Sequence, residues 1–372
     1  MKKVVLVNQN SGYLTIDIAN AFTTKYDEVI LMAGFIKPME RALSPKVKTQ
    51  KIARYDRTSN FKRIYTWLFG SLQIFFLVLS KYRKFEIIYF TNPPMAYLFS
   101  IVLKNKFSLV IYDTYPDALK TIGIRENNLI FKIWAKLNKR VFKNATKLIT
   151  LSDGMAALLS KYTEKEKIKT IPNWAGSDNF APVLKENNPF VKEHNFQNKF
   201  IVLYSGNMGY THNVETIIEV AKLLKENNGV HFLMIGDGQK KEKLIQLSKE
   251  YQIKNITFLA WQPAAVLPYS LASSDLSVIT LNDETSNLSV PSKTYNLLAT
   301  GSPILCIAPK TSELAKLIDT YSNGKCFENK EIIEMANYVK LVAADSILKN
   351  KLSENSLNAS KDFSKSNAFL YV

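Results

Sequence analysis

Short apolar runs alternate with stretches of helical periodicity along most of this chain. In the first half, residues 129–142 show the helical pattern, with apolar residues at 129, 133, 137 and 141. The strand-like runs of this half are residues 4–7, 29–31, 87–90, 109–112 and 148–150. Continuous apolar runs separated by helices predict parallel βαβ units.

The alternation stops at residues 172–190, where three prolines, a glycine and polar residues leave no period, and we interpret this segment as a linker. Beyond it, strands are predicted at 200–204, 231–235, 256–259, 276–280 and 303–308, and helices at 214–225 and 241–251. The sequence therefore predicts an α/β protein of two facing Rossmann-like domains with a cleft between them, residues 1–171 and 191–345. Residues 346–372 are expected to form a helix returning towards the first domain.

The segment 287–305, NLSVPSKTYNLLATGSPIL, predicts a loop, a helix opening at Pro291-Ser292-Lys293, a glycine stop and a buried strand. Pro291 suits the first helical position, Ser292 can accept from free amides, and Lys293 adds positive charge to the helix N-terminus. Such an end attracts a diphosphate. An ordinary capped helix explains the same residues.

Two glycine-containing loops follow predicted strands of the second half. In SGNMGYTHN, residues 205–213, Gly206 and Gly209 let backbone amides approach a phosphate, although the loop is not a GxGxxG fingerprint. Gly236 and Gly238 of the GDG turn follow the next strand, where a tight turn explains them as well as ligand approach.

Charge is concentrated in the first half: residues 1–180 carry a net charge of +16, and residues 181–372 carry +1. Between Arg41 and Lys84 stand eleven basic residues and one acidic residue, around the apolar run 64–79. That run is short for a membrane span. We interpret the region as a docking surface for an anionic membrane. A buried helix accounts for the apolar run alone, and nucleic-acid binding lacks a recognisable motif.

Composition excludes several other classes of protein. The chain has 372 residues, 47% of them hydrophobic, and its N-terminus, MKKVVLVNQN, lacks the pattern of a secretory signal, so a cytoplasmic location is expected. Three histidines and no DxD carboxylate pair predict no metal site and no cofactor. Only His212 stands where it could contact a phosphate, and a solvated loop histidine is the alternative.

Together these segments resemble one known family, the retaining glycosyltransferases of the type-B fold, family 4, and within it the bacterial enzymes of capsule, O-antigen and exopolysaccharide synthesis. The resemblance covers nearly the whole chain and is strongest over residues 200–308. It is carried by YSGNMG (204–209), IGDG (235–238), FLAWQP (258–263), SLASSDLSVITL (270–281), VPSKTYNLLATGSPIL (290–305), IYDTYPDAL (111–119) and IPNW (171–174).

The resemblance implies that the second domain binds a sugar nucleotide and that the first binds the acceptor, a saccharide linked to a polyprenyl diphosphate at the inner face of the membrane. It implies backbone contacts to the diphosphate from Gly206, Asn207, Met208 and Gly209, with Lys293 neutralising the leaving group. Trp261 and Gln262 would lie by the base, where a core aromatic is the alternative for Trp261.

The chain departs from the wider family at several positions. The family's two glutamates would fall on Leu288 and Asn296, and of these Asn296 can still hydrogen-bond ribose hydroxyls. Its paired Arg and Lys would fall on Asn207 and His212, which leaves more of the diphosphate charge to Lys293.

We therefore expect a metal-independent, front-face displacement assisted by the leaving phosphate. Asp113 would orient or deprotonate the acceptor hydroxyl, and a turn-capping aspartate is the alternative. Two other functions use the same fold: a sugar-nucleotide epimerase or hydrolase, and a non-catalytic membrane-associated scaffold.

Overall fold

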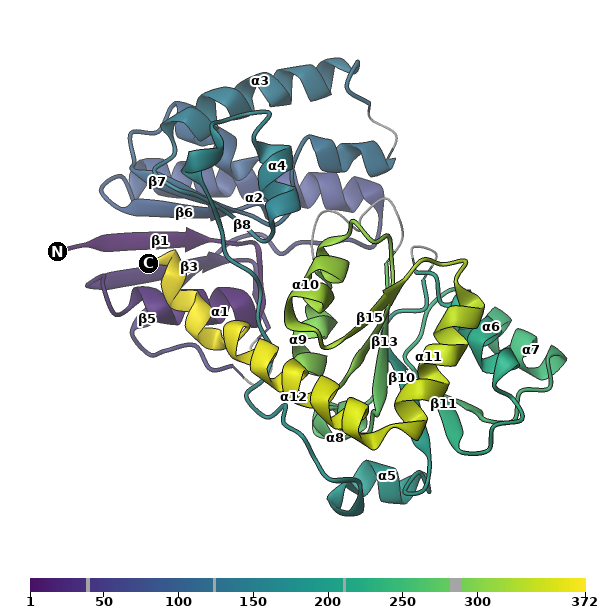
Figure 1. Ribbon diagram of the computed structural model, residues 1–372. Helices are drawn as coiled ribbons and strands as arrows, with labels where there is room; N and C mark the ends of the chain where they lie inside the picture. Colours follow the sequence, from purple (N-terminus) through teal and green to yellow (C-terminus); the bar gives the residue numbers. More distant parts are fainter. Residues whose placement is uncertain (38–40, 123–124, 210–211, 282–289) are drawn as a thin grey trace. The chain divides into compact units, whose positions relative to one another are not determined.

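The computed structural model describes residues 1–37, 41–122, 125–209, 212–281 and 290–372. The chain divides into two compact units: unit 1 comprises Met1–Gly176 with Lys365–Val372, and unit 2 comprises Ser177–Ser364. The division falls inside the segment 172–190 that the sequence predicts as a linker. Each unit has its own parallel sheet covered by helices (Figure 1).

Unit 1 is built on a seven-stranded sheet of order β5-β3-β1-β6-β7-β8-β9, in which every pair is parallel. Its strands are β1 (Lys3–Val7), β2 (Asn10–Ser11), β3 (Glu28–Ala33), β4 (Phe35–Ile36), β5 (Val47–Lys51), β6 (Glu86–Phe90), β7 (Phe107–Ile111), β8 (Leu148–Thr150) and β9 (Ile168–Thr170). Its helices are α1 (Tyr13–Phe22), α2 (Asn60–Ser80), α3 (Leu129–Asn144), α4 (Asp153–Leu159) and the 3-10 helices η1 (Ala96–Ile101), η2 (Asp117–Ile122), η3 (Lys165–Lys167) and η5 (Lys365–Tyr371).

Alternate residues of the central strands pack on opposite faces of this sheet, as a pleated strand requires. Val5 and Val7 join a buried cluster with Ile74 and Val78 of α2. Val4 and Leu6 join the cluster of the other face, which includes residues of α1 and Tyr371 of η5. Residues 365–372 therefore complete the core of unit 1.

Unit 2 is built on a six-stranded sheet of order β12-β11-β10-β13-β14-β15, also parallel throughout. Its strands are β10 (Phe200–Ser205), β11 (Val230–Ile235), β12 (Ile256–Leu259), β13 (Leu276–Thr280), β14 (Ile304–Ile307) and β15 (Gly324–Phe327). Its helices are η4 (Lys185–Asn187), α5 (Pro189–Glu193), α6 (Glu215–Leu223), α7 (Lys241–Glu250), α8 (Leu267–Leu271), α9 (Ser292–Ala299), α10 (Glu313–Tyr321), α11 (Ile332–Ala344) and α12 (Ser346–Asp362).

The predicted α/β architecture with two Rossmann-like units is confirmed. The sequence pattern did not predict β5 and β9, the two edge strands of unit 1. In β5 only Val47 of VKTQK is buried, so the apolar run that identifies an interior strand is missing.

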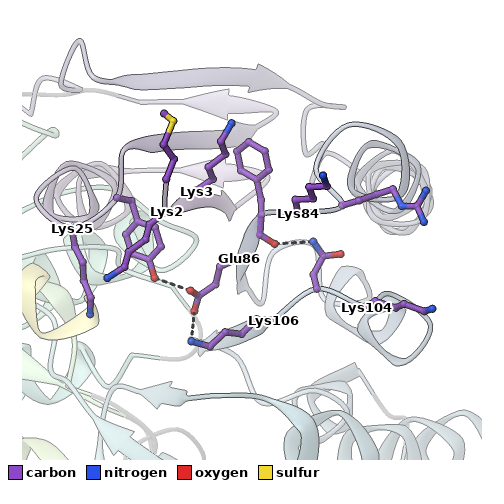
Figure 2. Close-up of a pocket in the computed structure, with 12 residues that line it drawn as sticks. Lys2, Lys3, Lys25, Lys84, Glu86, Lys104 and Lys106 are labelled. Atoms are coloured by element: carbon purple, nitrogen blue, oxygen red, sulfur yellow. Dashed lines mark hydrogen bonds and ion pairs between the residues drawn. The ribbon is translucent and has the colours of Figure 1, made fainter.

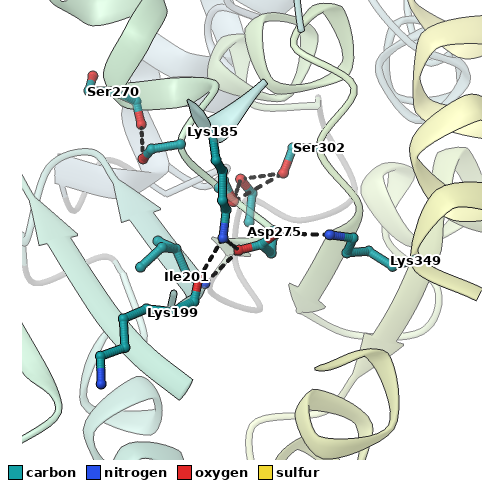
Figure 3. Close-up of polar contacts among 10 residues, drawn as sticks. Lys185, Lys199, Ile201, Ser270, Asp275, Ser302 and Lys349 are labelled. Atoms are coloured by element: carbon teal, nitrogen blue, oxygen red, sulfur yellow. Dashed lines mark hydrogen bonds and ion pairs between the residues drawn. The ribbon is translucent and has the colours of Figure 1, made fainter. Parts of the chain in front are cut away.

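Asp275, which precedes β13, ties distant parts of unit 2 together (Figure 3). Its carboxylate is 6% exposed and accepts from the backbone N–H of Ile201 at 2.8 Å. Lys185 forms an ion pair with it from η4, and Lys349 of α12 lies 3.1 Å away. One buried carboxylate thus connects the start of the unit, the central strand and α12.

Removing this carboxylate leaves two lysines and a backbone N–H without their partner, so Asp275→Ala is expected to lower the free energy of unfolding by about 2–4 kcal/mol. Asp275→Asn keeps an acceptor for Ile201 and should cost less. Urea denaturation followed by circular dichroism measures both. Glu193→Ala, which removes an exposed carboxylate, is the control, and equal effects of Asp275→Ala and Glu193→Ala would contradict the role of Asp275.

Candidate active site

The carboxyl ends of β10, β11, β12 and β13 lie at one edge of the unit 2 sheet, because all neighbouring strands are parallel. Ligands of open α/β sheets bind at this edge. The loop that follows β10 and the start of α9 meet there, and they bring together most of the residues that the sequence singled out in this half.

Lys293, the second residue of α9, directs its ammonium group against the loop after β10. Its Nζ lies 4.1 Å from the centre of the Tyr204 ring, and a Cβ placed on Gly206 would stand 2.9 Å from it. Among the described residues, Nζ has no hydrogen-bond partner, although it is buried. Burial lowers the pKa of Lys293 to about 7. A buried cation without an anion suits an anionic ligand.

The start of α9 differs by one residue from the prediction. Pro291 is the N-cap, with φ −57° and ψ 135°, rather than the first helical residue. Ser292 is therefore the first residue of the helix and is exposed, and the N-cap residue Pro291 makes no side-chain capping hydrogen bond. Helical side chains lean towards the N-terminus of their helix, which explains how Lys293 reaches back to Gly206.

The loop Gly206–Gly209 uses only part of its backbone for internal bonds. The amides of Gly206 and Met208 donate to Ile235 O at 3.0 Å and to Asp237 O at 2.8 Å. The Met208 side chain is fully buried in the core. The amides of Asn207 and Gly209 make no backbone hydrogen bond among the described residues, so they are the donors available to a phosphate.

The GDG turn supports this loop by close packing. Gly236 and Gly238 have φ angles of +138° and +149°, which favour glycine. A Cβ at Gly236 would stand 2.0 Å from Gly206 O, and one at Gly238 would stand 2.5 Å from Met208 O. Close packing against the loop after β10 therefore explains why both positions are glycine, and the sequence did not suggest this packing.

His212 lies near the ammonium group of Lys293. Its pKa is lowered by burial first, and then by the charges of Lys293 and Lys240. Lys240 donates to the His212 carbonyl at 2.8 Å and forms an ion pair with Glu215 at 2.9 Å. This pair holds the far end of the loop to α6.

The other predicted donor-site residues that the structure describes follow β12, at the same edge of the unit 2 sheet, or belong to α9. Trp261 and Gln262 follow β12; Trp261 is 55% exposed rather than a core aromatic, and Gln262 Nε2 donates to Ala260 O at 3.0 Å. Asn296 is half-buried in α9. Leu288 lies outside the described residues.

Tyr204 is the residue of this site that the sequence analysis missed. Its ring lies under the Lys293 ammonium, and its hydroxyl donates to Asn207 O at 2.7 Å. In the sequence, Tyr204 is recognisable as the aromatic residue directly before Ser205 and Gly206 of the loop. It was not singled out because it also fits an ordinary buried residue of the predicted strand.

In unit 1, Asp113 follows β7 and lines a hollow of about 320 Å³ at the carboxyl ends of β1, β6 and β7. The Asp113 side chain is partly exposed, yet surrounding protein removes some of its water and raises its pKa above the usual value. Asn8 Oδ1 and Asn92 Oδ1 in the same hollow have no hydrogen-bond partner among the described residues. The hollow thus offers a carboxylate and polar acceptors to a hydroxylated ligand.

Helix α2 buries one side against unit 1 and exposes a second, largely apolar side. Gly70, Ser71, Ile74 and Val78 are buried, while Gln73 Oε1 accepts from Ala53 N at 2.7 Å. The exposed residues form a stripe at helical spacing, each 43–79% exposed: Phe61, Ile64, Tyr65, Leu68, Phe69, Leu72, Phe76 and Leu79. Among the described residues α2 is the one helix long and apolar enough to cross a membrane, with a mean hydropathy of 1.3.

Basic side chains gather where α2 ends. A hollow of about 580 Å³ lies at the amino ends of β1, β6 and β7, and it is lined by seven basic residues and one acidic residue, Glu86. Figure 2 shows the side chains that line it. Within the described chain, Lys84 and Lys104 have no ion pair. Arg41, in contrast, is buried and paired with Asp17 at 3.4 Å, so it does not belong to the predicted docking surface.

Comparisons with known proteins agree with this arrangement. Residues 186–359 match the family model described as glycosyl transferases group 1. The probable glycosyltransferase WbjE of Pseudomonas aeruginosa is 26% identical over 338 residues, covering 87% of this chain and 84% of that protein. The putative colanic acid biosynthesis glycosyl transferase WcaI of Escherichia coli is 25% identical over 231 residues, covering 60% of this chain and 56% of that protein.

Solved structures share the fold at low sequence identity. Anabaena HepE, solved in complex with UDP, has a TM-score of 0.75 at 15% identity and covers 99% of this chain and 98% of that chain. WaaG, a glycosyltransferase involved in lipopolysaccharide biosynthesis, has a TM-score of 0.65 at 15% identity, covering 96% and 95%. Over residues 186–359 the chain is thus similar to the group 1 glycosyl transferases, and it shares the type-B fold of the solved structures.

Proposed function

We propose that this protein is a retaining glycosyltransferase of surface polysaccharide synthesis, which moves a sugar from a nucleoside diphosphate sugar to a saccharide carried on a polyprenyl diphosphate. The observation that carries the proposal is the buried Lys293 ammonium beside Gly206, at the ligand edge of unit 2, which has no hydrogen-bond partner among the described residues. The names of the relatives WbjE and WcaI support glycosyl transfer, that of WcaI also supports a role in polysaccharide synthesis, and the UDP complex of HepE supports a nucleoside diphosphate donor.

The donor site has the parts that a diphosphate requires. The Asn207 and Gly209 amides supply directed donors, and the α9 N-terminus adds a partial positive charge. Lys293 supplies the full charge, and its flexible stem lets Nζ move from the Tyr204 ring to a phosphate oxygen. Trp261, exposed after β12, offers a ring face to the base.

Transfer develops negative charge on the departing nucleoside diphosphate, and positive groups placed before the reaction stabilise that charge. Lys293 and the helix N-terminus do this here, so we propose a metal-independent reaction. The acceptor hydroxyl attacks from the face that the leaving phosphate vacates, which retains the anomeric configuration. Its proton passes to Asp113 where Asp113 acts as the base, and to a phosphate oxygen where Asp113 only positions the hydroxyl.

Asp113 is proposed to position or deprotonate that acceptor hydroxyl. Its raised pKa makes it a better proton acceptor than an ordinary aspartate. Asn8 Oδ1 and Asn92 Oδ1 can accept hydrogen bonds from other hydroxyls of the acceptor sugar.

We further propose that the protein is cytoplasmic and docks on the inner face of the membrane through the apolar stripe of α2. Because Ile74 and Val78 of α2 are fully buried in the core of unit 1, crossing the bilayer would remove them from that core. The helix instead suits an in-plane position, with its stripe in the head-group region and the basic hollow near anionic lipids.

A donor screen with UDP-, GDP- and dTDP-sugars, read by ligand-induced stabilisation, tests the transferase proposal directly. NMR of the product's anomeric linkage then tests retention. If no sugar nucleotide stabilises the protein, the proposed function is wrong; if a sugar nucleotide is isomerised or hydrolysed without an acceptor, the epimerase or hydrolase alternative replaces it.

Binding of UDP at pH 8 is expected to take up close to one proton, since the pKa of Lys293 rises from about 7 when a diphosphate pairs with it. The affinity should therefore fall as the pH rises above 7. Isothermal titration in buffers of different ionisation enthalpy measures the uptake. Lys293→Met should abolish it and weaken binding by about tenfold or more, whereas Lys243→Met, at an exposed position, should do neither; identical uptake in both variants would contradict this role.

Asp113→Asn should lower kcat of transfer by about 10²–10⁴-fold, because the amide cannot accept the proton of the acceptor hydroxyl. Stabilisation by UDP should not change, since Asp113 belongs to unit 1. Steady-state kinetics and thermal shift measure the two effects. Asp27→Asn, an exposed change at the other edge of the sheet, is the control; full turnover by Asp113→Asn removes the proposed role.

Vesicles containing phosphatidylglycerol should carry the protein upward in a flotation assay at low salt. Leu72→Glu with Phe76→Glu should reduce the floating fraction at least tenfold, because both side chains belong to the exposed stripe. Ile333→Glu with Ile347→Glu, at exposed positions of unit 2, is the matched control. Docking is ruled out if the unmodified protein stays at the bottom, and the α2 stripe is ruled out if both double variants float equally.

A further inference from the structure

An aromatic cluster lies beside Asp113 at the ligand edge of unit 1. The rings of Tyr55 and Trp67 stack with centres 5.7 Å apart, and the Tyr115 ring meets Trp67 edge-on at 5.9 Å. Tyr55 follows β5, and Tyr115 follows β7 in the same turn as Asp113. The catalytic proposal above uses none of these three rings.

Gln9 fixes this cluster to the sheet. It follows β1, and its Nε2 donates to Ala53 O at 3.0 Å and to Thr66 O at 2.8 Å. The first bond holds the segment that carries Tyr55, and the second holds the turn of α2 that carries Trp67. The cluster is therefore positioned by the sheet edge and not only by its own contacts.

Two neighbouring N–H donors in the cluster lack acceptors. Arg63 lies with its guanidinium carbon 5.4 Å from the Trp67 ring. Both Arg63 Nε and Trp67 Nε1 are buried without a hydrogen-bond partner among the described residues. Buried donors without acceptors are rare and costly, so an oxygen-rich group that reaches them binds favourably.

Charges of both signs act on the cluster. The pKa of Tyr115 is raised by burial first and then by the Asp113 carboxylate and the neighbouring Tyr55 hydroxyl, while the Arg63 guanidinium lowers it. The pKa of Tyr55 is likewise raised mainly by burial, and the charges of Arg63, Arg57 and Asp113 act on it as well. A cation and the proposed reactive carboxylate thus flank the same rings.

We propose that Arg63, Trp67 and Tyr115 form the acceptor subsite for a glycosyl phosphate, in which Arg63 and Trp67 Nε1 bind the phosphate and the rings pack against the sugar. The inference deepens the proposed function and rests on it. It specifies that the phosphate attached to the acceptor sugar is recognised directly, within reach of Asp113.

The chemistry of the three side chains fits such a ligand. A guanidinium binds phosphate through two parallel N–H bonds, and sugars pack their C–H faces against aromatic rings. Ile64 and Leu68, which flank Arg63 and Trp67 in α2, belong to the exposed apolar stripe. A phosphate bound at Arg63 therefore lies where the lipid of a membrane-held acceptor meets its saccharide.

The test uses sugar 1-phosphates as probes, with the full chain kept saturated with UDP so that unit 2 is occupied. Dissociation constants for glucose, galactose and N-acetylglucosamine 1-phosphates are measured by NMR titration and compared with those of the corresponding methyl glycosides. At least one 1-phosphate should bind about tenfold or more tightly than its methyl glycoside. The subsite is overturned if no 1-phosphate is preferred.

Variants assign the preference to particular side chains. Arg63→Ala should remove the preference, while Arg83→Ala, which removes an exposed arginine from the basic hollow, should retain it. Trp67→Phe keeps a ring without the N–H and should weaken 1-phosphate binding several-fold. If Arg63→Ala does not fold, Arg63→Lys and Trp67→Phe decide, because both retain most of the packing. An unchanged preference in these variants contradicts the subsite.

UDP-induced stabilisation separates the two proposals. If UDP stabilises the protein but the 1-phosphates are not distinguished from methyl glycosides, the subsite is wrong and the transferase proposal stands. If UDP and the sugar nucleotides fail to stabilise the protein, the proposed function itself is wrong.

Discussion

The Lys293 ammonium, buried by protein and without an ion-pair partner in the part of the chain that the structure describes, is the constraint on which the site of unit 2 depends. It reaches its position because Gly206 has no side chain, and Gly206 stays in place because Gly236 lets β11 approach its carbonyl. Tyr204 closes the other side with its ring face, which attracts a cation far less than a phosphate does. Each of these features loses its purpose if the site binds no anion.

The cost of this arrangement is visible in the pKa of Lys293, which burial lowers to about 7. Near neutral pH the charged and neutral forms of Lys293 are therefore present in similar amounts. A diphosphate shifts that balance, so binding of the nucleotide and protonation of the lysine are linked events. Binding of a diphosphate therefore favours the protonated form of Lys293.

In unit 1, the two edges of the sheet and the outer side of α2 differ in charge and polarity. The carboxyl edge carries Asp113, the aromatic cluster and two amide oxygens that have no hydrogen-bond partner among the residues described, whereas the amino edge carries the basic hollow. The outer side of α2 is apolar along its length. A parallel sheet makes this separation possible, because loops at its two edges belong to different sets of residues and vary independently.

Periodicity predicted the alternation of strands and helices well, because interior parallel strands are continuous apolar runs and their helices show a clear stripe. It failed for β5, whose polar edge sequence carries no such run. At the site, the sequence indicated Lys293 and the loop glycines but not Tyr204, and it placed Pro291 one residue too far into α9. Local spacing specifies which residue types meet a ligand edge, whereas the packing of Gly236 and Gly238 against another loop arises only in three dimensions.

Eight residues at the end of the sequence, 365–372, belong to the unit that begins it. The Tyr371 ring packs edge-on against Trp174, and Lys25, Lys147 and Lys169 donate to the oxygens of Val372 and Leu370. During synthesis, the first unit consequently emerges from the ribosome with one side of its core uncovered, and it waits for the whole of the second unit before that side can close. The core of unit 1 is thus completed only after residues 365–372 have been translated.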